Sequence, residues 1–371
     1  MLAARQLTVS ASQVRDALVS AWLLAAALVV GACSAPLPNA TETPAKTVEA
    51  EQVPNAETTP LQPYQLLEVT VVPFSLSTAS QKPVSTMESR LFAWQLREVL
   101  AESARWGAVR MLPESDEISE LAISGRIITA DGQRVALWVR VVDSTGRVWL
   151  EREYAHVASA EDYPDERVAY RDPFRSIYYR IARDLDRLRA SFDQRSLQRI
   201  QETAQVKYAA HIAPAAFSEY VTETDSGWQL NRLPADGDPI MDRVLRVRDA
   251  ELLFVDTVDQ SYSAFYRQVY PAYSQWRRLS FEERVALQQL QTSGPSDRRG
   301  FGGMRDNYRD YREIQLAEAS LRDLLRSIRF EAAPTVVELE DRQRTLEGSI
   351  EQQYEQWRSL LDGIYRSELG L

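Results

Sequence analysis

The chain has very little cysteine and histidine. Its 371 residues include one cysteine, Cys33, and two histidines, His156 and His211. A single cysteine excludes an internal disulfide, so we expect the fold to depend on packing alone. Because only two histidines are present, most zinc sites and most Ser/His/Asp catalytic arrangements are excluded. We therefore expect neither a metal nor a cofactor.

An excess of positive charge is lacking as well. The chain holds 43 Lys and Arg against 53 Asp and Glu, which gives a formal net charge of -10 and a pI near 5.0. Sequence-independent nucleic-acid binding needs a basic face to neutralise phosphates, so we expect no nucleic-acid partner.

The apolar run near the N-terminus is too short to span a membrane. Arg5 and Arg15 precede residues 17–30, which are apolar except for Ser20. A spanning helix needs about 20 such residues, whereas a short run behind a charged segment is typical of a targeting signal. Residues 1–32 are therefore predicted to be a signal peptide.

The segment Val30-Gly31-Ala32-Cys33 resembles the bacterial lipobox, in which small residues precede a cysteine. The resemblance implies cleavage between Ala32 and Cys33, diacylation of the Cys33 thiol and acylation of the new N-terminus. Three acyl chains, at about 0.8 kcal/mol per buried methylene, make release negligible. By resemblance to Gram-negative lipoproteins, Ser34 in place of aspartate indicates the outer membrane. The alternative is that Cys33 is an ordinary residue of a membrane-anchor helix.

Residues 33–63 are predicted to be a disordered tether that follows the lipidated cysteine. They are rich in Thr, Ala, Glu and Gln and contain six prolines, at positions 36, 38, 44, 54, 60 and 63. Such a composition cannot bury a core and favours extended conformations. At about 3.1 Å per residue the tether reaches on the order of 90 Å when fully extended.

Residues 64–158 are predicted to form a small α/β sandwich. A β-branched strand at 65–74 precedes a helix that opens at a capping-box spacing, Ser85 to Glu88, and a short strand at 108–112. Apolar residues then alternate through three segments between 121 and 150, separated by Asp131-Gly132 and by the turn at 143–146. The pattern predicts a mixed sheet with an antiparallel meander.

This order of elements resembles the periplasmic domains of several outer-membrane lipoproteins. The resemblance is most specific at Val71-Val72-Pro73-Phe74 and at the turn Asp143-Ser144-Thr145-Gly146. Similar domains occur in the curli-secretion-channel, flagellar outer-membrane and penicillin-binding-protein-activator lipoproteins, and at the N-terminus of the Tol-system propeller protein. The chain departs from the curli channel because no pair of long alternating strands follows, so we expect no pore.

Residues 165–371 are predicted to be a helical bundle with a short β-hairpin near the C-terminus, which makes the fold class α+β. We expect helices at 174–207, 214–221 and 239–276, a loop at 222–237, and a helix that opens at Ser280 with Glu283 at its capping-box position. Pro271 should kink or end the third helix. A helix at 306–328, a hairpin at 335–347 and a last helix capped by Ser349 and Gln352 complete the prediction.

Three features of the sequence are candidate chemical sites. The glycines between 292 and 304 follow no strand and lack a GxxxxGKS order, so an interhelical loop is favoured over a phosphate site. Inward carboxylates on helices can bind metals, but that site class uses Glu-x-x-His pairs, which are missing, so a solvated face is favoured. The carboxylates in question are Asp249, Glu251, Asp256, Asp259, Glu282 and Glu283.

The aromatic seam from Phe254 to Trp276 is the third feature. Such stripes are ordinarily bundle core, although a ligand or a partner helix is the alternative. Tyr, Trp and Arg dominate interface hot spots, which selects five residues as possible partner contacts. They are Tyr266, Tyr270, Trp276, Arg277 and Arg278.

We therefore expect a non-enzymatic lipoprotein, anchored by its N-terminal lipid at the periplasmic face of the outer membrane. The expected role is that of an assembly or scaffold factor for a secretion or appendage complex of the cell envelope, with a protein partner and with oligomers possible. The alternative is a regulator that binds a peptidoglycan synthase, suggested by the reach of the tether and by the activator-lipoprotein resemblance. An enzyme is the third hypothesis.

Overall fold

The computed structural model describes residues 60–76, 83–114, 119–163, 172–292, 335–339 and 342–369, with isolated positions between 312 and 319. The predicted signal peptide, Cys33 and the tether up to residue 59 lie outside the described residues. So do the glycine-rich segment after residue 292 and most of the predicted helix at 306–328. Residues from Ala50 onward form one compact unit, and the features below belong to it.

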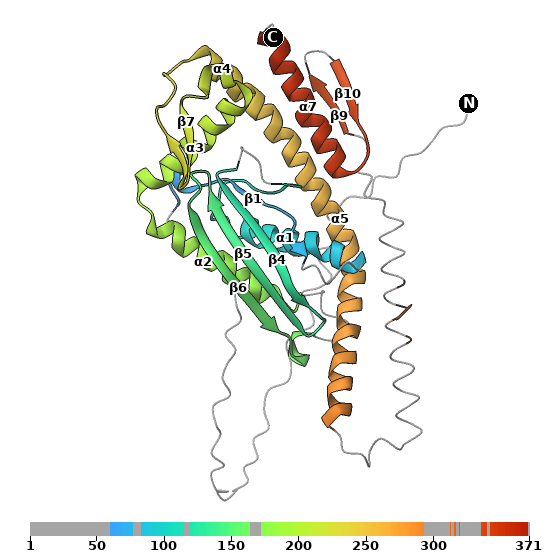
Figure 1. The fold of residues 1–371 in the computed structure, drawn as a ribbon. Coiled ribbons are helices and arrows are strands. Elements are labelled where there is room, and N and C mark those ends of the chain that lie inside the picture. Colours follow the sequence, from blue (N-terminus) through green and yellow to red (C-terminus); the bar gives the residue numbers. More distant parts are fainter. Residues whose placement is uncertain are drawn as a thin grey trace, which may run out of the picture. The chain divides into compact units, whose positions relative to one another are not determined.

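A six-stranded mixed sheet occupies the N-terminal half (Figure 1). Its strands are β1 (Val69–Val71), β2 (Ser75–Leu76), β3 (Val109–Met111), β4 (Leu121–Ala130), β5 (Arg134–Asp143) and β6 (Val148–Val157), in the order β3-β1-β4-β5-β6 with β2 beside β4. The strand β1 pairs in parallel with β3 and β4, and β2 pairs in parallel with β4. The strands β4, β5 and β6 form the predicted antiparallel meander. Both β1 and β2 pair with β4, so the predicted strand at 65–74 is interrupted around Pro73, which has no backbone N–H to donate.

The turn after β5 is held by the buried carboxylate of Asp143. One oxygen accepts the backbone N–H of Thr145, at 2.9 Å, and the other accepts the indole N–H of Trp149, at 2.8 Å. Gly146 has a φ of +88°, a left-handed conformation that glycine adopts without strain. The Asp-x-x-Gly pattern therefore corresponds to a tight turn that fixes the register of β6.

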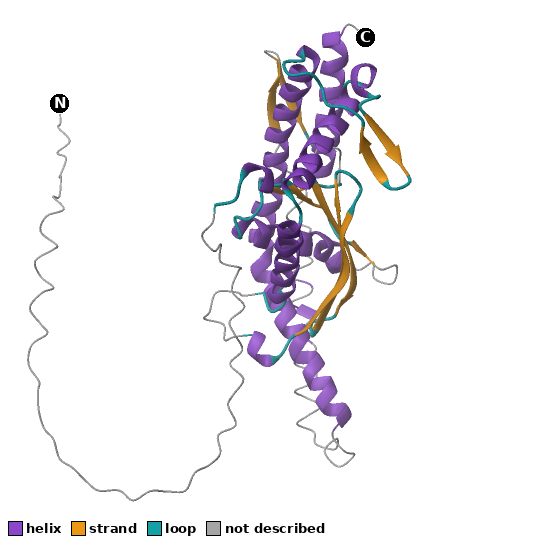
Figure 2. Ribbon diagram, turned by 90° about the vertical axis from the view of Figure 1, so that its left-hand side faces the viewer, coloured by secondary structure: helices purple, strands orange, loops and turns teal. Residues whose placement is uncertain are grey.

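Two helices pack on one face of the sheet (Figure 2). The α1 helix (Pro83–Glu102) buries Leu91, Phe92, Leu96 and Leu100, and α2 (Arg175–Ser191) buries Ile177, Ile181 and Leu185. The α1 helix begins at Pro83, two residues before the predicted cap Ser85, and the Glu88 side chain pairs with Arg277. Two short 3-10 turns, η1 (Pro63–Gln65) and η2 (Ala160–Asp162), precede and follow this sheet domain.

The predicted helix at 174–207 is two helices. Phe192 is extended, with φ −86° and ψ 142°, and Asp193 then caps α3 (Gln194–Ile212) by accepting the backbone N–H of Ser196 at 2.7 Å. The short α4 helix (Pro214–Phe217) follows. The predicted loop at 222–237 is also wrong in part, because β7 (Val221–Thr224) and β8 (Gly227–Leu230) form a hairpin there.

One continuous helix, α5 (Pro239–Thr292), replaces the two helices predicted between 239 and 291. Pro271 lies inside it, and the Ser280 hydroxyl donates to the carbonyl of Trp276 within the helix instead of capping a new one. Buried residues recur at helical spacing on both sides of the proline, from Val258 to Tyr273. This shared packing outweighs the local cost of the proline.

The C-terminal elements agree with prediction. The strands β9 (Thr335–Leu339) and β10 (Arg342–Leu346) form the hairpin, and α7 (Ile350–Leu369) follows. Ser349 and Gln352 form a reciprocal capping box, with distances of 2.9 Å and 3.2 Å between the backbone nitrogens and the side-chain oxygens. The α7 helix packs on α5, where the rings of Phe254 and Trp357 stack at 4.9 Å.

The largest hydrophobic core joins the sheet, α1, α2, α5 and α7. A smaller cluster around Tyr208, Phe217 and Val244 lies between α3, α4 and the start of α5. The mixed α+β class is confirmed, while the boundary between domains at 64–158 and 165–371 stays a prediction. Across the residues that the structure describes, no helix combines the length and the apolar character needed to cross a membrane.

Candidate functional site

The five predicted partner-contact residues occupy different environments. Tyr266 is 0% exposed and Arg277 is 1% exposed, so both make their contacts inside the chain. Tyr270 and Trp276 are partly buried at the edge of the core. Arg278 is on the surface, where its Nε donates to Glu282 one turn along α5, at 3.0 Å. Their role in partner contact stays a prediction.

Arg277 belongs to a buried ion pair between α5 and α1. Its Nη2 lies 3.1 Å from Glu88, its Nε donates to the hydroxyl of Tyr273 at 2.8 Å, and that hydroxyl donates to Glu88 at 2.9 Å. The rings of Phe92 and Phe174 lie within 5.8 Å of the guanidinium. Burial raises the pKa of Glu88, and the charge of Arg277 opposes this rise.

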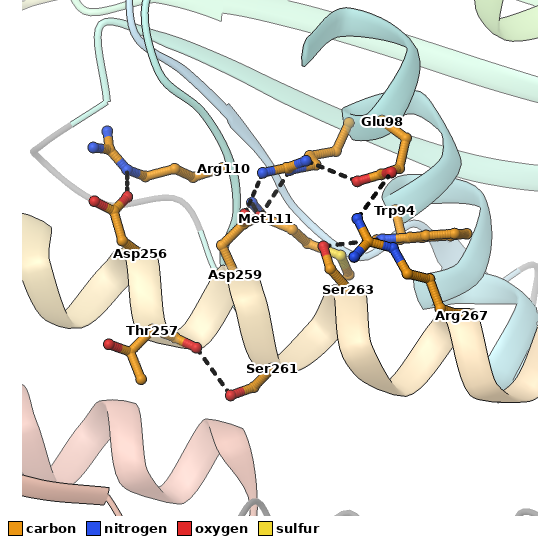
Figure 3. Close-up of polar contacts among 11 residues, drawn as sticks. Trp94, Glu98, Arg110, Met111, Asp256, Thr257, Asp259, Ser261, Ser263 and Arg267 are labelled. Atoms are coloured by element: carbon orange, nitrogen blue, oxygen red, sulfur yellow. Dashed lines mark hydrogen bonds and ion pairs between the residues drawn. The ribbon is translucent and has the colours of Figure 1, made fainter. Parts of the chain in front are cut away.

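Three of the six carboxylates considered as metal ligands contact arginines or a tyrosine of the preceding elements. Asp259 accepts the Nε of Arg97 at 3.0 Å and the backbone N–H of Met111 at 2.8 Å, and Asp256 accepts the Nε of Arg110 at 2.6 Å (Figure 3). We call these two ion pairs the α5 latch. Glu251, which is buried, accepts the hydroxyl of Tyr208 in α3 at 2.7 Å.

Of the remaining three candidates, Asp249 and Glu282 are exposed and Glu283 is half-buried. Glu282 pairs with Arg278 as described. Among the described residues, no group of three or more His, Cys, Asp or Glu side chains gathers as a metal ion would require. Asp256 and Asp259 attach α5 to the sheet domain, and Glu251 attaches it to α3.

A cavity lies where α1, α2 and α5 meet, and we call it the α1–α2–α5 pocket. Its volume is about 120 Å³. Since one water needs about 10–15 Å³ of such volume, the pocket has room for a side chain or several waters. It is lined by Trp94, Gln95, Glu98, Val99 and Glu102 of α1, by Asp172, Arg175 and Tyr178 at the start of α2, and by Tyr270 of α5.

The pocket has an aromatic floor and a charged rim. Tyr178 is 0% exposed and Trp94 is 8% exposed, whereas the side chains of Glu102 and Arg175 are 46% and 37% exposed. The Tyr178 hydroxyl donates to the side-chain oxygen of Gln95 at 2.6 Å. The floor is thus held in place by a hydrogen bond between α1 and α2.

Asp172 is the carboxylate nearest the start of α2. It accepts the backbone N–H of Phe174 at 2.9 Å and a hydrogen bond from the side chain of Gln95. Burial raises the pKa of Asp172 to about 6, and these hydrogen bonds together with the charges of Arg277 and Arg175 oppose the rise.

The sequence reasoning named Tyr270 but missed the rest of this pocket. One signal was present: Trp94, Glu98 and Glu102 follow one another at four-residue spacing and so share one face of α1. Asp172 and Arg175 come from a segment some seventy residues later in the chain. Nothing in their local pattern places them beside α1.

No family model and no curated protein matches the chain. Among solved structures, a dodecamer of PelC from Paraburkholderia phytofirmans is similar to part of it. The identity is 18%, and the match covers 34% of this chain and 90% of that one, with a TM-score of 0.22. A TM-score this low carries no argument about fold or function.

Proposed function

We propose that the chain is a lipid-anchored, non-enzymatic lipoprotein at the periplasmic face of the outer membrane. Its role is to bind a protein partner as an assembly or scaffold factor of a cell-envelope complex. The observation that carries this proposal is the lipobox-like segment that ends in Cys33, the one cysteine of the chain, followed by a proline-rich stretch and a folded α+β body.

The chemistry of the described residues supports a binding role. The buried carboxylates of α5 are engaged by arginines or by a tyrosine, so they hold elements together. The α1–α2–α5 pocket combines aromatic rings with charges at its rim, a combination suited to recognising a group of another molecule.

The anchor is tested with Cys33→Ala in the full chain. We expect this variant to incorporate no labelled palmitate and to leave the outer-membrane fraction, because a single thiol carries the lipid. Ser34→Asp is the matched control, since it keeps the thiol while changing the residue that marks the outer membrane. It should remain lipidated and shift to the inner membrane. Outer-membrane fractionation of Cys33→Ala equal to that of the unmodified chain would contradict the proposal.

A further inference from the structure

Two of the aromatic walls of the α1–α2–α5 pocket are set at an angle to each other. The ring centroids of Trp94 and Tyr270 are 6.5 Å apart, with an interplanar angle of 54°. The Trp94 indole donates its N–H to Ser263 of α5 at 3.3 Å, which fixes the position of its ring. Ring faces carry partial negative charge and attract cations within about 6 Å.

Three carboxylates line the same pocket, and two of them already have arginine partners. Glu102 pairs with Arg175 at 2.5 Å, and Glu98 pairs with Arg97 at 2.7 Å and with Arg267 at 3.6 Å. Glu98 and Glu102 are thereby neutralised at the rim.

Asp172 is different. No described basic side chain lies within ion-pair distance of it, and Arg175 and Arg277 act on it only from farther away. A carboxylate that is partly buried without a close counter-ion is under-compensated, and a cation brought next to it is stabilised more strongly than at the surface. The pocket therefore places one available negative charge beside aromatic faces.

We infer that the α1–α2–α5 pocket binds the cationic side chain of a lysine or an arginine from the partner protein. The cavity is sized for one side chain, and its wall includes the apolar Val99 beside Trp94, against which the methylene stem packs. The charged end then lies at Asp172 and the rings of Trp94 and Tyr270. This inference rests on the proposed function, because it names the chemistry of the partner.

The test titrates the purified full chain with three small probes and measures their binding by NMR. Each probe is a single amino acid whose amino and carboxyl groups are blocked and therefore uncharged. The probes are Nα-acetyl-lysine methylamide, Nα-acetyl-arginine methylamide and, as the reference of similar length without charge, Nα-acetyl-norleucine methylamide. We expect at least one cationic probe to bind at least tenfold more tightly than the norleucine probe. Whichever cationic probe binds more tightly identifies the side chain.

Asp172→Asn should weaken binding of the cationic probe at least fivefold and leave the norleucine probe unchanged. Glu282→Gln is the matched control, since it removes a carboxylate of α5 that is outside the pocket, and it should change neither probe. Because Asp172 also accepts the backbone N–H of Phe174, just before α2, its replacement can disturb the local fold, and Tyr270→Leu is the second variant. It removes one ring from a partly buried position and should weaken the cationic probe severalfold.

Equal binding of all three probes to the unmodified chain would overturn the inference, as would an equal loss in the Glu282→Gln control. Neither result tests the proposed function, which depends on the lipid anchor. Conversely, if the Cys33→Ala variant stays in the outer membrane, the proposed function is contradicted, but the pocket's preference for cations can still be measured.

Discussion

At the scale of single residues, buried charges decide much of this protein's chemistry. Glu120, the residue before β4, is 7% exposed, and its carboxylate accepts the backbone N–H of Glu68 at 2.8 Å. Burial raises the pKa of Glu120 to about 7, chiefly because the charged form loses its hydration, while the hydrogen bond from Glu68 opposes the rise. A sequence shows that this residue is a glutamate but gives no sign that it is buried.

Glu120 gives the unfolding free energy a specific pH dependence. Its pKa is raised from 4.5 to about 7 on folding, so its contribution is fully present below pH 4.5 and is lost as the pH rises to about 7. The loss is on the order of 3 kcal/mol for a shift of this size. Glu120→Gln should therefore gain stability relative to the unmodified chain when urea unfolding is measured at pH 8 instead of pH 4.5. The exposed Glu223→Gln should show no such gain, and a similar gain in both variants would refute the assignment.

At the scale of elements, regular helices and strands followed their local patterns except where packing overruled them. The meander, the C-terminal hairpin and the Ser349 cap form as their patterns predict. The failures have physical causes: α5 runs through Pro271 because its buried residues pack on both sides of it, and the predicted helix at 174–207 breaks where Asp193 provides a new cap. The local sequence favours one conformation, and tertiary packing then stabilises or destabilises that conformation by several kcal/mol.

Replacing Pro271 measures how much this proline destabilises α5. Pro271 is exposed, and its ring leaves the carbonyl one turn earlier, at Arg267, without the helical N–H donor. Pro271→Ala should stabilise the fold by about 1–3 kcal/mol in urea unfolding, since alanine restores the donor and has the best helix propensity. Gln268→Ala, at another exposed position of the same helix, should change stability by less than about 0.5 kcal/mol. Destabilisation by Pro271→Ala would contradict this account of the proline.

At the scale of the whole molecule, α5 connects the sheet domain to the C-terminal helix. It carries the latch to α1 and β3 on one side, the ion pair of Arg277 with Glu88, and the aromatic contact with α7. Because one hydrophobic core includes all of these elements, loss of a buried latch contact should lower the unfolding free energy of the whole fold.

The two halves of the α5 latch make a matched pair of variants. The side chain of Asp259 is 6% exposed and that of Asp256 is 47% exposed, and each pairs with one arginine of the sheet domain. Asp259→Ala should cost about 2–3 kcal/mol, since it leaves the buried N–H of Met111 without its acceptor and leaves Arg97 with Glu98 as its remaining partner. Asp256→Ala should cost less than about 1 kcal/mol because its ion pair is solvated. Equal losses in urea unfolding would contradict this account of burial.

The sequence by itself determined the local features of this protein: the alternation of the meander, the tight turn at Asp143 to Gly146 and the capped last helix. Each depends on residues close together in the chain, so spacing and residue type suffice to predict it. Only the tertiary structure decided which charges are buried and which residues meet. Trp94, Asp172 and Tyr270 come from three separate segments, and the pocket they share exists because α1, α2 and α5 pack on one core. Burial and the resulting electrostatics are properties of that packing, and no local pattern encodes them.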